Sequence, residues 1–310
     1  MTLVLAAGLC GWAALQSCGA AVQESGGTAT VSEGEATAAD SGASSVERPP
    51  AGVRKKGIGH WSPSHGKHGL DPVVIDELGC GWFYNWTPRP RAAAQKVEAE
   101  FIPMIWGESN VSDEALAGVK AGGYSALLGF NEPDSRGQAN ISVARAIELW
   151  PKLMATGLSL GSPGTTQGAR WLDEFMEEAD RRGYRVDFIC LHWYDDITRP
   201  DAVENLRRYL TRYWERYKRP LWLTEFSGGD WEWCSRRPVT FEDNARFARE
   251  VIPMLESLPF VERYAWFSSK VTPSDRYYPT TGLYESADKI TVVGAAYRDA
   301  DKRAEAAGPE

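Results

Sequence analysis

The sequence predicts an α/β fold, a single (β/α)₈ TIM barrel preceded by a disordered N-terminal segment. Eight apolar, strand-like runs recur from residue 56 to residue 267, and amphipathic helical patterns separate most of them. Strands that alternate with helices indicate a parallel sheet, and eight such units over roughly 210 to 250 residues match a closed barrel. An open doubly wound sheet is the alternative, but no Gly-x-Gly-x-x-Gly pattern follows the first strand.

The N-terminal region carries features of an export signal and a tether. Residues 1–19 are small and apolar, as in a secretory signal, although no Lys or Arg precedes them. Leu15-Gln16-Ser17-Cys18 resembles a bacterial lipobox, in which Cys18 would be lipidated; a plain signal peptide or a disordered start is the alternative. Residues 20–52 contain almost no large apolar side chain and are expected to form a flexible linker. We therefore expect a secreted protein or a cell-envelope lipoprotein.

The barrel is expected over residues 53–300, followed by a disordered tail over residues 301–310. The predicted strands are Lys56–Gly59, Trp82–Trp86, Phe101–Trp106, Ala126–Glu132, Leu158–Pro163, Val186–Tyr194, Leu221–Phe226 and Val261–Phe267. The predicted helices are Asp71–Leu78, Ala139–Met154, Ala169–Arg182, Glu204–Tyr217 and Phe241–Leu258. The helix at 204–217 has the clearest pattern, because Leu206, Leu210 and Trp214 recur at helical spacing.

The ends of the predicted strands carry polar and aromatic residues. In a barrel the carboxyl ends of all strands form one face, and that face holds the active site. The residues at these ends are His60 and Trp61, Asn85 and Trp86, Trp106, Asn131 and Glu132, His192 to Tyr194, Glu225, and Trp266 with Phe267. One topology would therefore bring together groups that are far apart in the sequence.

Two of these strand ends deliver a glutamate. Glu132 ends the fourth predicted strand within Asn131-Glu132-Pro133, and Glu225 lies at the end of the seventh. The two strands face each other across the barrel, so the carboxyl groups could flank a substrate. Such a pair suits acid/base and nucleophilic chemistry on a glycosidic bond, with a separation of about 5–5.5 Å for retention and roughly 6.5–9.5 Å for inversion. The alternative is a structural, ion-paired role for both acids.

Composition excludes several other functions. The net charge is -8 and no Lys/Arg-rich run occurs, so no nucleic-acid partner is expected. His60, His65 and His68 lie close in sequence without a carboxylate or cysteine at ligand spacing, so neither a metal site nor a cofactor is expected. Thirteen Trp residues leave enough indole rings for sugar platforms in addition to the core. A monomer is expected.

Two segments carry a family resemblance. Gly129–Asp134 and Trp222–Phe226 resemble the signature segments of clan A glycoside hydrolases, and the chain is more closely similar to glycoside hydrolase family 128. The other segments that agree are Trp82–Trp86, Phe101–Gly107, Asp187–Tyr194 and Tyr264–Phe267. The resemblance extends from Lys56 to Gly294, essentially the whole predicted barrel.

The resemblance implies a retaining endo-β-1,3-glucanase whose partner is a β-glucan polysaccharide or oligosaccharide. Glu132 would then be the acid/base and Glu225 the nucleophile, while Asn131 would hydrogen-bond the sugar 2-OH. This assignment of roles has a physical reason. The charge of an ionised nucleophile raises the pKa of the neighbouring carboxyl group, which therefore stays protonated as the acid.

Further side chains are expected to bind the sugar. They are Asn85, Trp86, Trp106, His192, Tyr194, Trp231, Trp233 and Trp266. Trp231 and Trp233 follow Gly228-Gly229 and are expected to form an aromatic wall beside the nucleophile. For His192 and for the tryptophans at strand ends, a role in the core is the alternative.

Two other functions remain open at this level. A clan A hydrolase of a β-1,4 or β-1,6 glycan would use the same pair of glutamates and differ only in its aromatic subsites. A non-catalytic glycan-binding barrel would not need both acids, and both are present.

Overall fold

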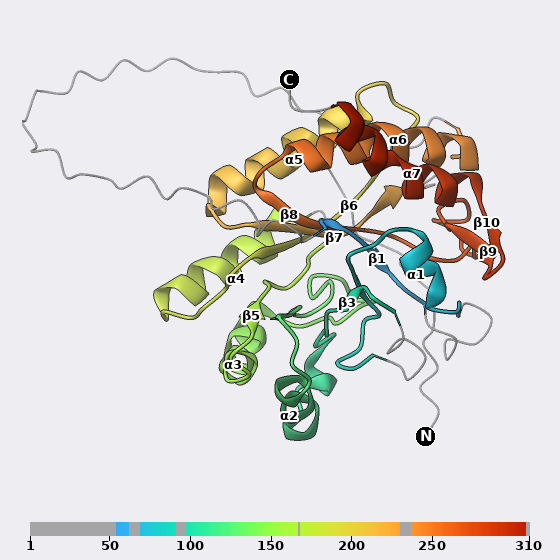
Figure 1. Cartoon of the computed structure of the whole chain (residues 1–310). Helices are drawn as coiled ribbons and strands as arrows, with labels where there is room; N and C mark the ends of the chain where they lie inside the picture. Colours follow the sequence, from blue (N-terminus) through green and yellow to red (C-terminus); the bar gives the residue numbers. More distant parts are fainter. Residues whose placement is uncertain (1–53, 62–68, 91–96, 167, 230–236, 308–310) are drawn as a thin grey trace, which may run out of the picture. The chain divides into compact units, whose positions relative to one another are not determined.

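The computed structural model describes residues 54–61, 69–90, 97–166, 168–229 and 237–307 (Figure 1). The chain divides into two compact units, residues 1–47 and 48–310, and only the second contains described residues. The signal segment, Cys18 and the linker therefore stay predictions. None of the described helices is both long enough and apolar enough to cross a lipid bilayer.

Strands and helices alternate along the second unit, as predicted. A helix follows every barrel strand except β2, after which residues 91–96 lie outside the described part. The elements in chain order are β1 (Lys56–Gly59), α1 (Val73–Glu77), β2 (Trp82–Tyr84), β3 (Glu100–Phe101), the 3₁₀ helix η3 (Glu108–Asn110), α2 (Asp113–Ala121), β4 (Ala126–Leu127), α3 (Val143–Met154), β5 (Ser159–Leu160), α4 (Ala169–Arg181), β6 (Ile189–Asp195), α5 (Ala202–Tyr217), β7 (Leu221–Gly228), α6 (Phe241–Ser257), β8 (Val261–Trp266), β9 (Tyr284–Ser286), β10 (Lys289–Ile290) and α7 (Val292–Ala307).

The strands close into a parallel barrel. Six of them form one sheet in the order β3-β2-β1-β8-β7-β6, and β4 pairs with β5. Isolated parallel bridges join the two parts: Met104–Leu128 links β3 to β4, and Gly161–Phe188 links β5 to β6. The (β/α)₈ prediction is therefore confirmed, because pairing runs from each strand to the next and β8 returns to β1.

Several predicted boundaries differ from the structure, since β3, β5 and α3, for example, are shorter than predicted. The predicted strand over 126–132 is regular only at Ala126–Leu127; Leu128 and Asn131 form isolated parallel bridges, and Glu132, with a φ of 41°, leaves the extended conformation. The predicted tail from residue 301 is wrong in its first part: α7 continues to Ala307, and Asp301 forms a salt bridge with buried Lys56 of β1 at 2.7 Å.

Large rings of β2 fill the barrel interior. Trp82 and Tyr84 are fully buried there, and β1 faces them with glycines. A Cβ at Gly57 would lie 2.3 Å from Trp82 Nε1, and one at Gly59 would lie 2.9 Å from the ring of Trp86. Only glycine at these two positions leaves room for the indoles, one of which reaches the mouth of the barrel.

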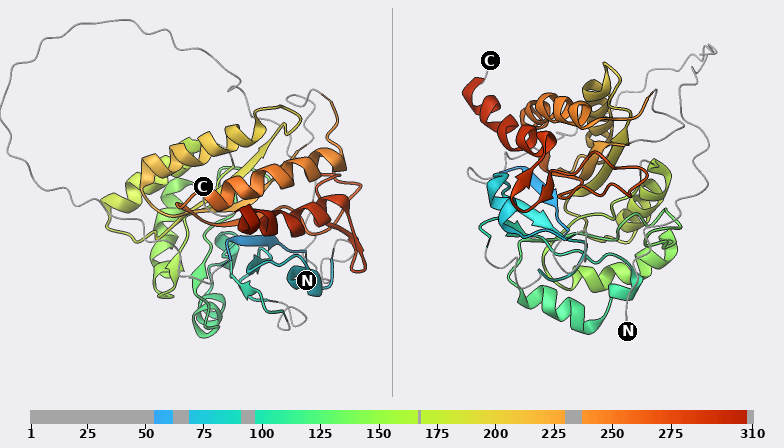
Figure 2. Two further views of the ribbon diagram at one scale, coloured as in Figure 1. Left: turned by 45° about the horizontal axis from the view of Figure 1, so that its top comes forward. Right: turned by 90° about the vertical axis from the view of Figure 1, so that its right-hand side faces the viewer.

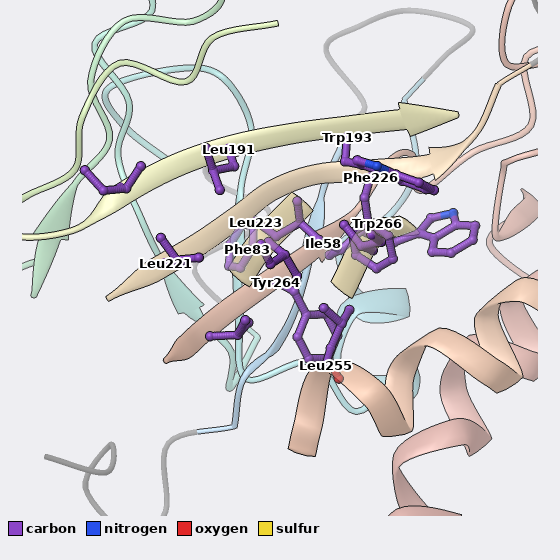
Figure 3. Close-up of a cluster of buried hydrophobic side chains, with 14 of the residues drawn as sticks. Ile58, Phe83, Leu191, Trp193, Leu221, Leu223, Phe226, Leu255, Tyr264 and Trp266 are labelled. Atoms are coloured by element: carbon purple, nitrogen blue, oxygen red, sulfur yellow. The ribbon is translucent and has the colours of Figure 1, made fainter. Parts of the chain in front are cut away.

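The main apolar core lies between the strands and the surrounding helices. Figure 1 shows α5, α6 and α7 on one side of the strands, and Figure 2 shows these three helices in a row. Side chains of the strands meet α6 in this layer; Tyr264, for example, donates a hydrogen bond to Glu256 of α6 at 2.7 Å. Phe226 and Trp266 pack together in the same layer, with ring centroids 5.2 Å apart (Figure 3). This packing fixes the C-terminal ends of β7 and β8.

A β-bulge shapes the end of β7. The register with β6 passes from Leu191 opposite Leu223 to His192 opposite Glu225, so Thr224 is an extra residue in β7. The register with β8 also shifts between Leu223 and Phe226. Bulges of this kind re-aim side chains beside active sites, and this one places Glu225 opposite His192.

Candidate active site

The two predicted glutamates lie close together at the carboxyl ends of the strands. One oxygen of Glu132, one of Glu225 and a ring nitrogen of His192 all lie within 4.8 Å of one another. Glu225 is 5% exposed and Glu132 is half-buried. The distance between these nearest oxygens is closer to the spacing of about 5–5.5 Å in retaining glycosidases than to the roughly 6.5–9.5 Å of inverting ones.

Three aromatic side chains donate hydrogen bonds to Glu225. Tyr84 and Trp86 both donate to Oε1, at 3.1 Å and 2.8 Å, and Tyr194 donates to Oε2 at 2.6 Å. Tyr84 also reaches the Thr224 carbonyl at 2.9 Å, beside the bulge. Both carboxylate oxygens are therefore held in fixed directions by donors that are themselves packed in the barrel.

Glu132 occupies a strained backbone position. Its φ of 41° lies in the left-handed region, where glycine is favoured, and its N–H donates to the Gly164 carbonyl at 2.6 Å. Asp134 ties this turn to the next strand end, because its carboxylate accepts hydrogen bonds from the Thr166 N–H at 3.0 Å and from the Thr166 hydroxyl at 2.5 Å. Such strain collects at functional sites, where the surrounding structure maintains it.

The pKa of Glu132 is raised above its ordinary value. Burial is the largest cause; the hydrogen bond and charge of His192 act in the opposite direction, and the charge of Glu225 adds to the rise. A raised pKa keeps the carboxyl group protonated to a higher pH, as a general acid requires.

His192 joins the two acids. Its Nδ1 lies 3.0 Å from Glu132 Oε1 and 3.6 Å from Glu225 Oε2, and its ring is 1% exposed. Burial lowers the pKa of His192, but the charge of Glu225 and the hydrogen bond to Glu132 outweigh it, and the net shift is upward. His192 therefore contacts the carboxyl groups directly.

The same three side chains have the composition of a metal site. A histidine that binds a metal through one nitrogen normally donates the other N–H to an acceptor. His192 Nε2 is buried and has no hydrogen-bond partner among the described residues. The surroundings of Nε2 therefore argue against a resident metal ion.

Aromatic rings line the site beyond the glutamates. Trp86 stacks on Trp61 with ring centroids 4.6 Å apart, and Phe267 packs edge-on against Trp86 and Tyr194 at 5.9 and 5.8 Å. Tyr278 extends the group, 4.8 Å from the ring of Tyr194. Each of these rings is only partly buried, so each keeps a face that a sugar could contact.

Trp106 and the two asparagines also lie at strand ends. Trp106 is half-buried against the barrel interior. Asn131 is 4% exposed, and its Oδ1 has no partner within the described part of the chain. Asn85 is 1% exposed; its Oδ1 accepts from the Thr87 hydroxyl at 2.6 Å, while its amide nitrogen lacks a partner among the described residues.

Trp266 does not reach the site. It is fully buried, donates to the Thr281 carbonyl at 2.8 Å and packs between Phe226 and Tyr297. Its predicted sugar contact is therefore wrong, because the side chain of this position points outward from the barrel into the helix layer. Trp231 and Trp233 lie outside the described residues, and their predicted wall stays a prediction.

Sequence reasoning missed Tyr84. The signal was present, because Trp82, Tyr84 and Trp86 alternate along one strand and must share its inward face. The hydroxyl of Tyr84 contacts both the Thr224 carbonyl and Glu225 Oε1, beside the bulge in β7, which has no local pattern in the sequence of β2.

Comparison with protein families gives one match over most of the chain. The family described as "Glycosyl hydrolase catalytic core" matches residues 64–297. No curated protein matches the chain.

Solved structures of glycoside hydrolase family 128 are similar to the chain. A subgroup I endo-β-1,3-glucanase from Amycolatopsis mediterranei, a glutamate-to-alanine variant in complex with laminaripentaose, is 41% identical with a TM-score of 0.70, over 79% of this chain and 99% of that one. A subgroup II endo-β-1,3-glucanase from Sorangium cellulosum is 28% identical with a TM-score of 0.67, over 80% and 98%. A subgroup III curdlan-specific exo-β-1,3-glucanase from Blastomyces gilchristii is 28% identical with a TM-score of 0.59, over 79% and 97%.

Proposed function

The chain belongs to glycoside hydrolase family 128, and on this premise we propose that it is a retaining endo-β-1,3-glucanase. The similar enzyme from Amycolatopsis mediterranei is an endo-β-1,3-glucanase and has been crystallised with laminaritriose. The observation that carries the proposal is the spacing of Glu132 and Glu225, whose nearest oxygens lie within 4.8 Å. This spacing is closer to that of retaining enzymes, in which a carboxylate attacks the sugar directly, than to that of inverting ones.

The two acids take different roles in a double displacement. Glu225 attacks the anomeric carbon and forms a glycosyl ester, while Glu132 gives its proton to the departing glycosidic oxygen. Tyr84, Trp86 and Tyr194 hold the Glu225 carboxylate in place for the attack. The raised pKa of Glu132 keeps the proton available.

The second step reverses the role of Glu132. Ester formation removes the charge of Glu225, which is one cause of the raised pKa of Glu132. The pKa of Glu132 then falls, and its carboxylate can take a proton from the water that hydrolyses the ester. The same residue therefore serves as acid and then as base.

The sugar contacts follow from the groups around the acids. Asn131 lies next to Glu132 with a buried, unpartnered Oδ1 and would accept a hydrogen bond from the sugar 2-OH. Trp86 and Trp106, each partly exposed, would stack against apolar sugar faces, and the amide nitrogen of Asn85 would donate to a hydroxyl.

Product analysis on laminarin and curdlan tests this function. An endo-acting enzyme releases a series of oligosaccharides, whereas an exo-acting one releases a single short product. Proton NMR of fresh products should show β anomers first. Hydrolysis of β-1,4 or β-1,6 glucans without hydrolysis of β-1,3-glucan would contradict the proposed linkage.

Azide rescue tests the two roles. Glu225→Ala with azide should give an α-glycosyl azide, because azide replaces the nucleophile from the same side. Glu132→Ala with azide should give a β-glycosyl azide from the intact ester. The reverse pattern would exchange the assignments.

We also propose that the enzyme is exported and works as a monomer, attached to the cell envelope through a lipid on Cys18. Support comes from the lipobox-like Leu15–Cys18 and the linker composition. Labelling of expressing bacteria with a palmitate analogue should mark the full-length chain and not Cys18→Ala. Soluble, unlabelled protein in the medium would indicate a plain signal peptide.

A further inference from the structure

The ring of His192 is fixed by packing. Tyr209 of α5 donates a hydrogen bond to the His192 carbonyl at 3.0 Å, and the Nε2 edge lies against Gly164. A Cβ at Gly164 would lie 3.0 Å from Nε2, so glycine at this position allows the ring to pack closely against the chain. The side chain is 1% exposed and its Nδ1 lies 3.0 Å from Glu132 Oε1, so the directions of both ring nitrogens are set before any substrate binds.

The two nitrogens face different surroundings. Nδ1 is 3.0 Å from Glu132 Oε1, within hydrogen-bonding distance, and 3.6 Å from Glu225 Oε2, beyond it. Nε2 is buried, with no acceptor within reach among the described residues. A proton on Nε2 would create a buried N–H without a partner, which folded proteins rarely contain.

The catalytic acid proton could reside in three arrangements. An imidazolium beside an ionised Glu132 is favoured by the upward shift of the His192 pKa, but it needs a second proton on Nε2, which has no acceptor among the described residues. A neutral imidazole protonated on Nε2 also leaves this N–H unpaired, and it accepts the Glu132 proton at Nδ1, away from the substrate. In the third arrangement Nδ1–H donates to Glu132 Oε1, and the acid proton lies on Oε2. Only in the third arrangement does every buried N–H of His192 have an acceptor.

We propose that His192 is a positioning residue, locked as the Nδ1–H tautomer, which holds the acid proton of Glu132 on Oε2. The inference rests on the proposed function and deepens it. In the first step the Oε2–H bond of Glu132 breaks and its proton forms an O–H bond on the leaving sugar. The glycosidic C1–O bond breaks, and Glu225 forms an ester bond to C1. In the second step a water proton returns to Oε2. The proton on Nδ1 stays on His192 throughout.

The tautomer can be measured without turnover. The chain contains four histidines, so ¹⁵N-histidine spectra of the wild type and of His192→Asn identify the His192 signals by difference. We expect a protonated Nδ1 and an unprotonated Nε2 at neutral pH. A protonated Nε2, in either a neutral ring or an imidazolium, would overturn the proposal. This result does not depend on whether β-1,3-glucan is the substrate.

Kinetics give the second readout. His192→Phe fills the space without a donor, and we expect about a 100-fold loss of kcat/KM on laminarin but less than about a tenfold loss on a dinitrophenyl laminari-oligosaccharide, which needs no proton. His192→Asn keeps a donor near Nδ1 and should stay within about tenfold of wild type on both. Equal losses on both substrates, or no loss in His192→Phe, would overturn the positioning role. If His192→Phe does not fold, the Asn variant and the spectra decide.

Discussion

The indole N–H of Trp86 donates a hydrogen bond to Oε1 of Glu225 at 2.8 Å. The same ring stacks on Trp61 and keeps a partly exposed surface. The backbone of Trp86 has a φ of 58°, an unusual value for a bulky residue. This strained backbone conformation points the indole N–H of Trp86 at the nucleophile Glu225, while the ring keeps a face on which a sugar is expected to stack.

Trp86→Phe separates the two roles of this ring. It removes the donor to Glu225 and keeps an aromatic face, so we expect kcat on laminarin to fall by about 10- to 100-fold, the range of a hydrogen bond to a charged group. Trp106→Phe is the matched control, because Trp106 is another partly buried indole packed against the barrel interior. It should change KM more than kcat. Equal kcat values for Trp86→Phe and wild type would contradict the role of the donor.

The raised pKa of Glu132 predicts a stability cost for keeping this acid. The pKa of Glu132 is higher in the folded protein than in the unfolded chain. The free energy of unfolding therefore falls as the pH rises from the ordinary pKa of glutamate through the pKa of Glu132 in the folded protein. Glu132→Gln removes this loss and still accepts from His192, so its Tm should exceed that of wild type at pH 7 and match it at low pH.

The control for this prediction is Glu148→Gln. Glu148 lies on the surface of α3, and its pKa is lowered by the hydrogen bond to Arg145. This substitution should not raise the Tm at pH 7. Thermal unfolding measured across the pH range checks both signs, and a lower Tm for Glu132→Gln at pH 7 would refute the prediction.

Asp134 is expected to hold the turn that carries Glu132. Asp134→Ala removes both hydrogen bonds to Thr166, and we expect a loss of about 10- to 100-fold in kcat, because a small displacement of the acid reduces proton transfer. Thr166→Val removes only the hydroxyl and should lose less. Unchanged kinetics in Asp134→Ala would show that the Glu132 N–H bond to Gly164 suffices.

Lys56 is expected to fasten α7 to the barrel. Its ammonium group is buried, pairs with Asp301 and donates to the Arg298 carbonyl at 3.2 Å. Lys56→Met removes the ion pair between the buried Lys56 and Asp301 and should lower the free energy of unfolding by about 3 kcal/mol. Lys289→Met, which breaks the exposed pair with Glu285, should change it by less than about 0.5 kcal/mol. Urea unfolding of both variants measures the difference.

The sequence allowed the barrel to be predicted for a simple reason. Strands buried on both faces read as continuous apolar runs, and helices against them read as amphipathic patterns, so both periods are visible locally. The boundary at residue 300 was placed too early, because the pairing of Asp301 with Lys56 joins positions 245 residues apart and leaves no local pattern.

By itself, the sequence determined the fold class and the strand ends that bear Glu132, Asn131 and Glu225, because topology alone brings the carboxyl ends of parallel strands to one face. Only the tertiary structure decided which neighbours act on these acids. The bulge at Thr224 places Glu225 opposite His192 and within reach of Tyr84, whereas Trp266 packs into the core between Phe226 and Tyr297. A one-residue change of register reverses the face of every side chain that follows, and register depends on contacts between strands rather than on the sequence of either one.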